Sequence, residues 1–315
     1  MIKIRRYRDE DQPVWDAFNR GTKNRLFMFD RNYMDYHRDR FRDHSLMFYN
    51  EADELIALLP ACERDGKLAS HAGLTYGGFL TDAGMKQHTM NDCFEALNAY
   101  CREQGLKGII YKTIPHIYHT QPAEEDRYAL YANCGKLVTV DASTYVNLSA
   151  PLKMPKGRKA QISRAKREGV TIEILTEQKD YDAFIALENE VLTARHDTHA
   201  VHTGAELKML HDRFPENIHL FAAMKEGKLI AGTVVYEYDT AVHTQYMAAD
   251  EEARIIGALD LAVATVLERY RESKKWLDFG ISTEHGRIYL NEGLIAQKEG
   301  FGGRTGVYEI WELAI

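Results

Sequence analysis

The sequence contains no long apolar run and no obvious targeting segment. None of its 315 residues lie in a stretch that approaches the ~18 consecutive apolar residues needed to cross a bilayer. The N-terminus reads MIKIRRYRDEDQ, which is charged throughout and lacks the apolar core of a secretory signal. We therefore expect a cytoplasmic protein that does not insert into membranes.

Cysteine is also scarce, and none of it has C-x-x-C spacing. The four residues all lie in the first half of the chain: Cys62, Cys93, Cys101 and Cys134. This distribution fits neither a disulfide framework nor a zinc site, so we expect small, mostly buried thiols in a reducing compartment.

Two short histidine clusters resemble metal-ligand spacing. One comprises His116 and His119, and the other extends from His196 through His199 to His202. Neither lies on a predicted helix with i,i+4 spacing, and neither has a cysteine nearby. We expect no metal and no tightly bound cofactor.

The bulk composition is that of a globular protein of two domains. Hydrophobic residues make up 45% and charged residues 28%, and 315 residues exceed the usual size of one core. The net charge is −7, yet residues 151–169 hold seven basic residues and one acidic residue. This segment suits contact with phosphates, and it equally suits a solvated linker and helix face.

A domain boundary is indicated where two prolines and a glycine lie close together, in residues 151–157. We place an N-terminal domain at residues 1–150 and a C-terminal domain at 151–315. On both sides of the boundary, periodicity and turn residues predict a strand, two helices, an antiparallel meander, a helix, a strand, a helix and a strand.

The predicted elements that define this order are few. In the first half they include a helix at 31–41, a long helix at 89–103 and a strand at 108–112; in the second, a long helix at 259–272, a strand at 276–281 and a helix at 289–298. Thr203 and Glu206 predict a capping box. This is the order of the GNAT fold, found twice. The fold class expected is α/β of the α+β type: a tandem GNAT duplication with two mixed, largely antiparallel sheets flanked by helices.

Three patches of the second half resemble the Fem family of aminoacyl and acyl transferases. They are the arginine- and lysine-bearing helix at 157–170, the Asp278-Phe279-Gly280 strand, and the segment from Gln297 and Lys298 to Gly303. Tyr76-Gly77-Gly78 in the first half also fits. Gln297 stands where the family often has an aromatic residue, so the resemblance bears on the reaction type more than on the acceptor.

The resemblance implies an N-acyltransferase that moves an aminoacyl or acyl group to the amine of a cell-envelope or nucleotide-sugar precursor. Its donor would be aminoacyl-tRNA. Two alternatives stay open: an N-acetyltransferase that uses acetyl coenzyme A, and a non-catalytic scaffold that has lost its donor site.

Acyl transfer to an amine needs alignment and a stabilised oxyanion, but no side-chain nucleophile. Lys298 is the first catalytic candidate because the resemblance gives its cation a role near the oxyanion or a phosphate. A lysine that complements a helix C-terminus is the alternative. Asp278 is the second candidate, either as an acceptor of the amine proton or as a structural partner of the backbone.

Binding residues follow from spacing and position. Arg254-Ile255-Ile256-Gly257-Ala258-Leu259 is a partial match to the pyrophosphate pattern Q/R-x-x-G-x-G/A, so Arg254 and Gly257 are candidates for contact with a coenzyme A donor. For an anionic acceptor, the candidates are Arg195, His199, His202, Tyr76, Arg158 and Arg304.

Overall fold

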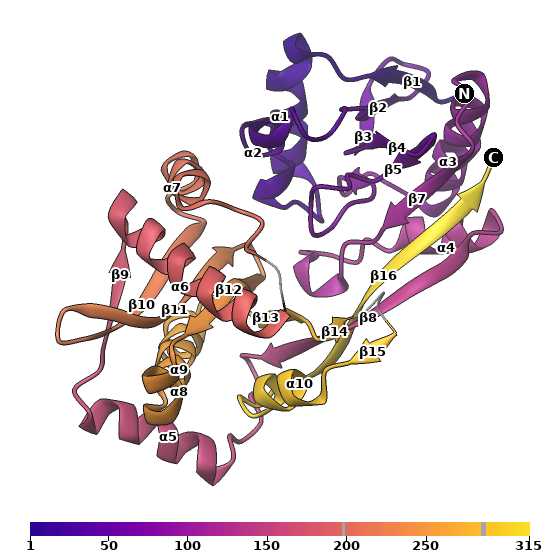
Figure 1. Cartoon of the computed structure of the whole chain (residues 1–315). Coiled ribbons are helices and arrows are strands. Elements are labelled where there is room, and N and C mark those ends of the chain that lie inside the picture. Colours follow the sequence, from indigo (N-terminus) through magenta and orange to yellow (C-terminus); the bar gives the residue numbers. More distant parts are fainter. Residues whose placement is uncertain (197–198, 285–287) are drawn as a thin grey trace. The chain divides into compact units, whose positions relative to one another are not determined.

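The computed structural model describes residues 1–196, 199–284 and 288–315, apart from the side chains of 194–196 (Figure 1). The chain forms two compact units, Met1–Asp141 with Val307–Ile315, and Ala142–Gly306. The predicted boundary after residue 150 thus differs from the boundary between the units by nine residues, and the last nine residues belong to the first unit. Within the described residues, no helix has the length and apolarity needed to span a membrane.

The first unit has short strands and one long helix. Its elements are β1 (Lys3–Arg6), α1 (Gln12–Gly21), α2 (Arg31–Met34), β2 (Leu46–Tyr49), β3 (Leu55–Leu59), β4 (Cys62–Arg64), β5 (Lys67–Ala69), β6 (Leu80–Thr81), α3 (Gln87–Glu103), β7 (Gly108–Lys112), α4 (Glu125–Ala132) and the start of β8 (Lys136–Asn147). Strands β1, β2, β3 and β6 form one sheet in that order. The apolar face of α3 packs into a core with Phe48, Phe79 and Tyr111.

The second unit contains longer strands. Its elements are α5 (Lys156–Arg167), β9 (Thr171–Leu175), α6 (Gln178–His196), α7 (Gly204–Arg213), β10 (Ile218–Lys225), β11 (Lys228–Glu237), β12 (Ala241–Ala249), α8 (Glu251–Ile256), α9 (Ala258–Tyr270), β13 (Trp276–Ile281), β14 (Thr283–Glu284), β15 (Tyr289–Leu290), α10 (Glu292–Glu299) and the start of β16 (Arg304–Ala314).

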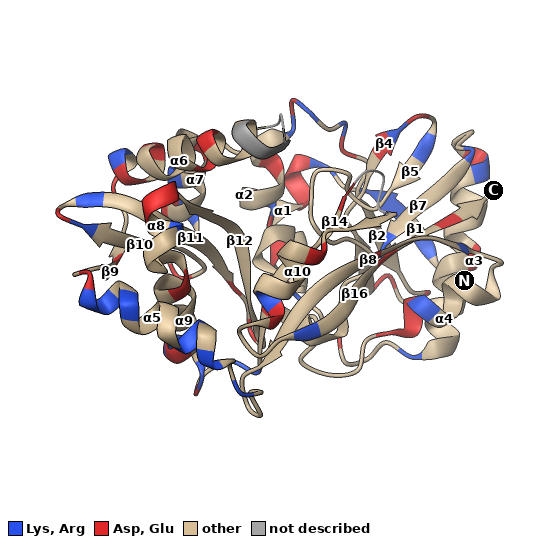
Figure 2. Ribbon diagram, turned by 60° about the horizontal axis from the view of Figure 1, so that its bottom comes forward, with Lys and Arg blue, Asp and Glu red and all other residues tan. Residues whose placement is uncertain are grey.

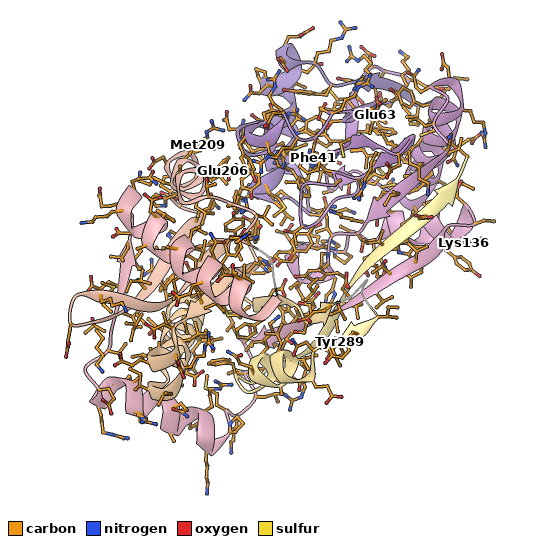
Figure 3. All side chains as sticks on the ribbon, viewed as in Figure 1. Phe41, Glu63, Lys136, Glu206, Met209 and Tyr289 are labelled. Atoms are coloured by element: carbon orange, nitrogen blue, oxygen red, sulfur yellow. The ribbon has the colours of Figure 1, made fainter. Side chains whose placement is uncertain are left out.

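The strands of this unit run in the order β8-β13-β12-β11-β10-β9. Among the described strands of this series, β12 and β13 alone pair in parallel, and their neighbours pair antiparallel. Helices α6 and α7 cover one face of the sheet, and α5, α8 and α9 lie on the other (Figure 1). Glu206 is labelled near the start of α7 in Figure 3. It forms the predicted capping box with Thr203.

Each unit is closed by a strand that the other half of the sequence provides. In the first unit, β7 pairs antiparallel with residues 310–314 of β16. In the second, β13 pairs antiparallel with residues 143–147 of β8. The closing strands of the two halves of the sequence are therefore exchanged.

Two predicted helices differ from the structure. The helix expected at 31–41 ends at Met34, and the turn that follows lets Asp43 reach the buried Arg31 guanidinium at 3.2 Å. The helix expected at 289–298 begins only at Glu292. The Asn291 side chain caps it by accepting from Leu294 N, and the residues before it form β15.

Candidate functional site

The candidate site lies where β12 and β13 part. The two strands pair only from Ala241 to His243 and from Trp276 to Asp278, although β12 continues to Ala249. On the other edge of β12, the register with β11 shifts so that Gln245 is an extra residue, which makes a β-bulge. A bulged residue leaves the ladder locally unpaired, so backbone donors become available to a ligand.

Strand β13 has its own irregularity beside this opening. Its register with β8 shifts between Asp278 and Ile281, and Gly280 has a left-handed φ of 71°. Fully buried Asp278 fixes this conformation: its Oδ1 accepts from the Gly280 amide at 2.8 Å and from Ser143 Oγ at 2.7 Å. Its Oδ2 lies 3.2 Å from His243 Nδ1 on β12. The carboxylate thus ties the two strands together at the point where they separate.

Lys298 completes this arrangement from α10. It is 3% exposed, and its Nζ donates to Gly280 O at 2.9 Å and to Ile281 O at 2.7 Å. An ammonium has three N–H donors, and among the described residues Nζ has no other partner, which leaves one N–H for a ligand. Burial lowers the pKa of Lys298 to about 8, against the opposing effect of Asp278. Lys298 and Asp278, the two predicted catalytic residues, therefore shape one bulge.

Buried polar atoms without partners gather on the elements around the opening. Several buried side-chain atoms of the described residues have no hydrogen-bond partner, and four of them are oxygens on these elements: Glu188 Oε2, Thr244 Oγ1, Gln245 Oε1 and Ser282 Oγ. Thr244 and Gln245 belong to β12, Ser282 follows β13, and Glu188 lies on α6, which packs against β12. Leaving such atoms unpaired costs about 1–3 kcal/mol each, so this concentration indicates a site prepared for a polar ligand.

Glu188 and Tyr246 supply the titratable groups of this cluster. Burial raises the pKa of Glu188 to about 7, and burial raises that of Tyr246 to about 12. Tyr246 OH lies 2.6 Å from His202 Nδ1, and the Glu188 charge acts on Tyr246. A carboxyl group that titrates near neutral pH can accept a proton during catalysis.

Of the residues predicted to bind an anionic acceptor, His202 joins this cluster and is 6% exposed. His199 is exposed, and its Nδ1 lies 3.4 Å from Thr193 Oγ1. Arg195 belongs to the last turns of α6, and its side chain lies outside the described residues. Arg304 begins β16 at the surface, where its Nη1 donates to Gly303 O at 2.6 Å.

Two further candidates occupy packing positions instead. Tyr76 is 1% exposed in the core of the first unit, and its hydroxyl lies 2.7 Å from that of Tyr118 and 2.8 Å from that of Tyr308. Arg158 bonds Asp260 and donates to Gln297 O at 2.9 Å. These contacts occupy the Tyr76 hydroxyl and both terminal nitrogens of Arg158, while the buried Arg158 Nε has no hydrogen-bond partner among the described residues.

Arg158 also stacks on the Phe301 ring, 4.2 Å from its centroid. It therefore links α5, α9 and the end of α10, which explains a basic residue in this part of α5 without a substrate.

The partial pyrophosphate pattern lies at the predicted helix start. Gly257 has a φ of 80° and directly precedes α9, while Arg254 Nε donates to Ala249 O at 3.0 Å. A Cβ on Gly257 would lie 2.7 Å from Gln161 O of α5, so glycine is required here by conformation and by close packing. The backbone of α5 thus occupies one side of this helix start.

Sequence reasoning missed Glu188, Tyr246 and the Gln245 bulge. A signal for Glu188 was present, because it continues the apolar spacing of Tyr181, Phe184 and Ile185 on α6, where a carboxylate has no structural reason to be. Tyr246 and Gln245 carry no local signal, since a bulge depends on the partner strand. Among the described residues, no group of three or more potential metal ligands occurs.

Comparison with known proteins agrees with this geometry. Residues 156–286 match the family described as "Acetyltransferase (GNAT) domain". The matched residues all lie within the second unit. No curated protein matches the sequence.

Solved structures show how far the GNAT likeness extends. The crystal structure of FemX has a TM-score of 0.70 at 11% identity over 99% of this chain and 97% of its own. L-PGS from Bacillus licheniformis has 0.65 at 12% identity, covering 98% and 92%. A tandem GNAT protein from the clavulanic acid biosynthesis pathway has 0.56 at 12% identity, covering 100% and 98%. The likeness confirms the predicted Fem-like, tandem GNAT fold.

Proposed function

We propose that this protein is an N-acyltransferase that works at the opening between β12 and β13. The acyl or aminoacyl group passes from an activated carrier to the amine of a cell-envelope or nucleotide-sugar precursor. The observation that carries the proposal is the coincidence of the parted parallel strands with the buried, unpartnered oxygens of Glu188, Thr244, Gln245 and Ser282. A packed scaffold would have no reason to keep these atoms unpaired.

The chemistry uses groups that the second unit already holds. The amine nitrogen bonds to the donor's carbonyl carbon, and the carbonyl oxygen becomes an oxyanion. Backbone N–H groups freed by the bulge at Gln245 stabilise that charge, which typically lowers a barrier by roughly 3–4 kcal/mol per donor. The oxyanion then collapses and the bond to the leaving group breaks; the leaving oxygen or sulfur takes up the proton that the amine loses, giving a tRNA hydroxyl or a coenzyme A thiol. Glu188, with a pKa of about 7, takes the proton from the amine.

Lys298 contributes in two ways under this proposal. Its bonds to Gly280 O and Ile281 O hold β13 in the bulged conformation, and its charge lowers the energy of nearby negative charge. Asp278 acts as a positioning residue, because its fully buried carboxylate bonds Gly280 N and Ser143 Oγ and lies beside His243 Nδ1. The predicted role of Asp278 as a proton acceptor is therefore assigned to Glu188 instead.

Acetyl coenzyme A is the second candidate donor, and the observation that favours it is the left-handed Gly257 at the start of α9. To separate the donors, the protein is incubated with an amine-bearing nucleotide-sugar peptide and either alanyl-tRNA or acetyl coenzyme A. Mass spectrometry of the acceptor shows a gain of an alanyl or an acetyl group. A protein that modifies neither this acceptor nor other peptide amines, with both donors present, would be a scaffold.

A further inference from the structure

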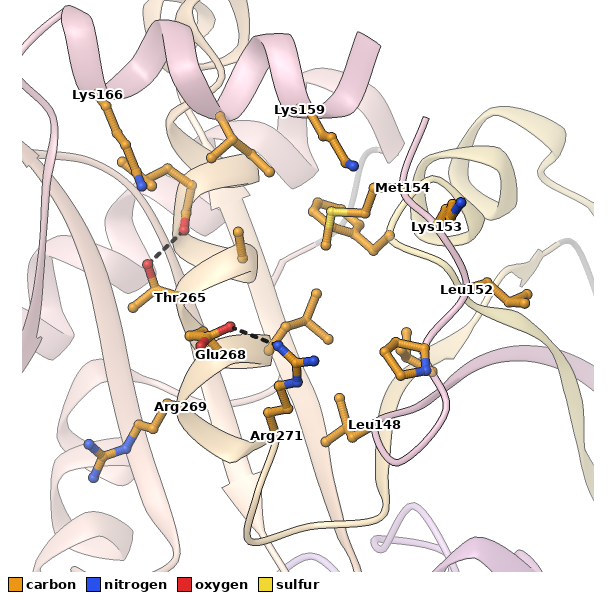
Figure 4. Close-up of a pocket in the computed structure, with 17 residues that line it drawn as sticks. Leu148, Leu152, Lys153, Met154, Lys159, Lys166, Thr265, Glu268, Arg269 and Arg271 are labelled. Carbon is orange, nitrogen blue, oxygen red and sulfur yellow. Dashed lines mark hydrogen bonds and ion pairs between the residues drawn. The ribbon is translucent and has the colours of Figure 1, made fainter. Parts of the chain in front are cut away.

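A second site lies in the second unit, away from the opening between β12 and β13. A groove of about 810 Å³ runs between α5, the last three turns of α9 and residues 146–154 (Figure 4). It adjoins the start of β13, whereas the candidate catalytic site lies at the end of that strand. The two sites are connected by packing, because Phe301, which lines the groove, has its ring centroid 5.6 Å from that of Phe279 on β13.

The floor of the groove is apolar. It includes Leu148, Met154, Ile162, Leu261, Leu267 and Phe301. Among its large aliphatic and aromatic side chains only Leu152 is exposed, at 48%. The apolar surface is therefore concave, and it suits one enclosed chain better than insertion into a bilayer, which requires protruding apolar side chains.

The rim of the groove is basic. Five cations line it, against one carboxylate, Glu268: they are Lys153, Lys159, Lys166, Arg269 and Arg271. Arg271 pairs loosely with Glu268 at 3.9 Å, but within the described part of the chain the three lysines take part in no ion pair. Figure 2 shows the same concentration of basic residues along α5. Unpaired lysines around an apolar floor are complementary to an anionic head group on an apolar chain.

We propose that this groove binds a single-chain phosphorylated lipid: one alkyl or acyl chain on the floor, with its phosphate held by the lysine rim. A phosphate suits the rim better than a carboxylate, since its three charged oxygens can meet several lysines at once. A nucleic acid suits it less well, because Phe301 is the sole aromatic lining residue and Arg158 already covers its ring.

Isothermal titration of the full chain with dodecyl phosphate, below its micelle concentration at pH 7, tests the proposal. We expect saturable binding of one molecule per chain. Dodecanol lacks the charge and inorganic phosphate lacks the chain, so each should bind at least about tenfold more weakly, which corresponds to a loss of about 1.4 kcal/mol.

Charge-reversal variants locate the site. Lys153→Glu with Lys159→Glu should weaken binding about tenfold or more, since each reversed charge sits at the rim. The matched control is Lys156→Glu with Arg167→Glu, which makes the same charge change on exposed residues of α5 outside the groove and should change the affinity less than twofold. Ala264 of α9 also lines the groove, so Ala264→Phe should abolish binding by filling it.

Four outcomes would overturn the proposal. They are the absence of saturable binding, an equal effect of the two charge-reversal pairs, no effect of Ala264→Phe in a variant that keeps the wild-type circular dichroism, and competition by inorganic phosphate alone. Vesicles of phosphatidylglycerol that bind equally to wild type and Ala264→Phe would indicate a membrane-contact surface instead. Transfer RNA that displaces the probe and is sensitive to both charge pairs would indicate an RNA surface.

Discussion

The two units use the same arrangement of a parallel strand pair in opposite ways. In the second unit, β12 and β13 part beside the unpartnered oxygens of Thr244 and Gln245. In the first, β5 and β7 pair in parallel at Leu68 and Ala69. Beyond this pairing, the space between the two strands is occupied by hydrogen-bonded groups of the protein itself. Ser70 Oγ accepts from Lys112 N at 2.6 Å, and Ser70 N donates to Ile110 O.

The end of the first unit's parallel strand pair is covered by the backbone around Gly77 and by aromatic side chains. Gly77 approaches Ser70 so closely that a Cβ would lie 2.3 Å from Ser70 O, and Tyr111 OH donates to Asp126 and accepts from Phe79 N. Ser70, Tyr111 and Asp126 are thus satisfied and stabilise the fold, whereas the buried Nδ1 of His71, next to Ser70, has no hydrogen-bond partner among the described residues. The comparison favours chemistry in the second unit, where four such atoms lie on the elements around the opening.

The largest effect should come from removing the carboxylate of the second unit. Glu188→Gln should lower kcat roughly 10²- to 10⁴-fold, because the proton acceptor is lost while the side chain keeps its shape. Glu190→Gln, on the exposed face of the same helix, is the matched control and should keep wild-type activity. Steady-state kinetics, with whichever donor and acceptor prove active, compares kcat of the two variants with that of the wild type. Equal activity of the two variants would show that a group other than Glu188 accepts the proton from the amine.

Replacing the buried cation should have the next largest effect. Lys298→Met should lower kcat about 10²- to 10³-fold, the usual consequence of losing a charge that stabilises an oxyanion. It should also lower the melting temperature, because Gly280 O and Ile281 O lose their donor. Lys298→Gln keeps N–H donors without the charge. If Lys298→Gln restores both activity and stability, the role of Lys298 is to hold the bulge, and its charge has no part in the reaction.

Stability should depend on pH through Glu188. Its folded pKa of about 7 lies above the ordinary value of 4.5, so the folded protein binds more protons than the unfolded chain between these pH values. Stability therefore falls as pH rises from 4.5 to 7, and Glu188→Gln should lack this part of the decline. Melting temperatures of wild type and variant across this range test the sign. A difference between them that stays constant with pH would show that Glu188 titrates normally.

Lys298 has the opposite effect on the pH dependence of stability, and it does so at higher pH. Its folded pKa of about 8 lies below 10.5, so the unfolded chain binds the extra proton and stability rises between these values. Chemical denaturation of wild type and Lys298→Met at pH 8 and pH 10 gives the comparison, and the gain with pH should be smaller in the variant.

The smallest effect should follow from a change in the first unit. Tyr76→Phe removes a hydroxyl from the buried tyrosine cluster and should cost about 0.5–1.5 kcal/mol of stability with kcat and KM unchanged. Urea denaturation and kinetics on one preparation measure both. An increase in KM with unchanged stability would return Tyr76 to the role of substrate binding that the sequence suggested.

The sequence predicted regular elements better than it predicted the site. Strand β13 has the predicted bounds at 276–281, and the capping box of Thr203 and Glu206 is present, because both depend on local spacing. Lys298 and Asp278 were found through a resemblance, and the structure joins them through Gly280. The bulge at Gln245, the partner of each closing strand and the burial of Glu188 depend on segments far apart in the chain. No window of residues contains that information.

The exchange of closing strands has a consequence for the order in which the protein matures on the ribosome. Domains commonly fold one after another as they emerge, the N-terminal one first. Here β7 can pair with β5 early, but its other edge lacks its antiparallel partner until residues 310–314 have left the exit tunnel. The N-terminal unit, translated first, is therefore completed last, and its exposed β7 edge persists through translation of the whole second unit. A nascent chain arrested before residue 307 would carry an open edge that invites chaperone binding or pairing with a neighbouring chain.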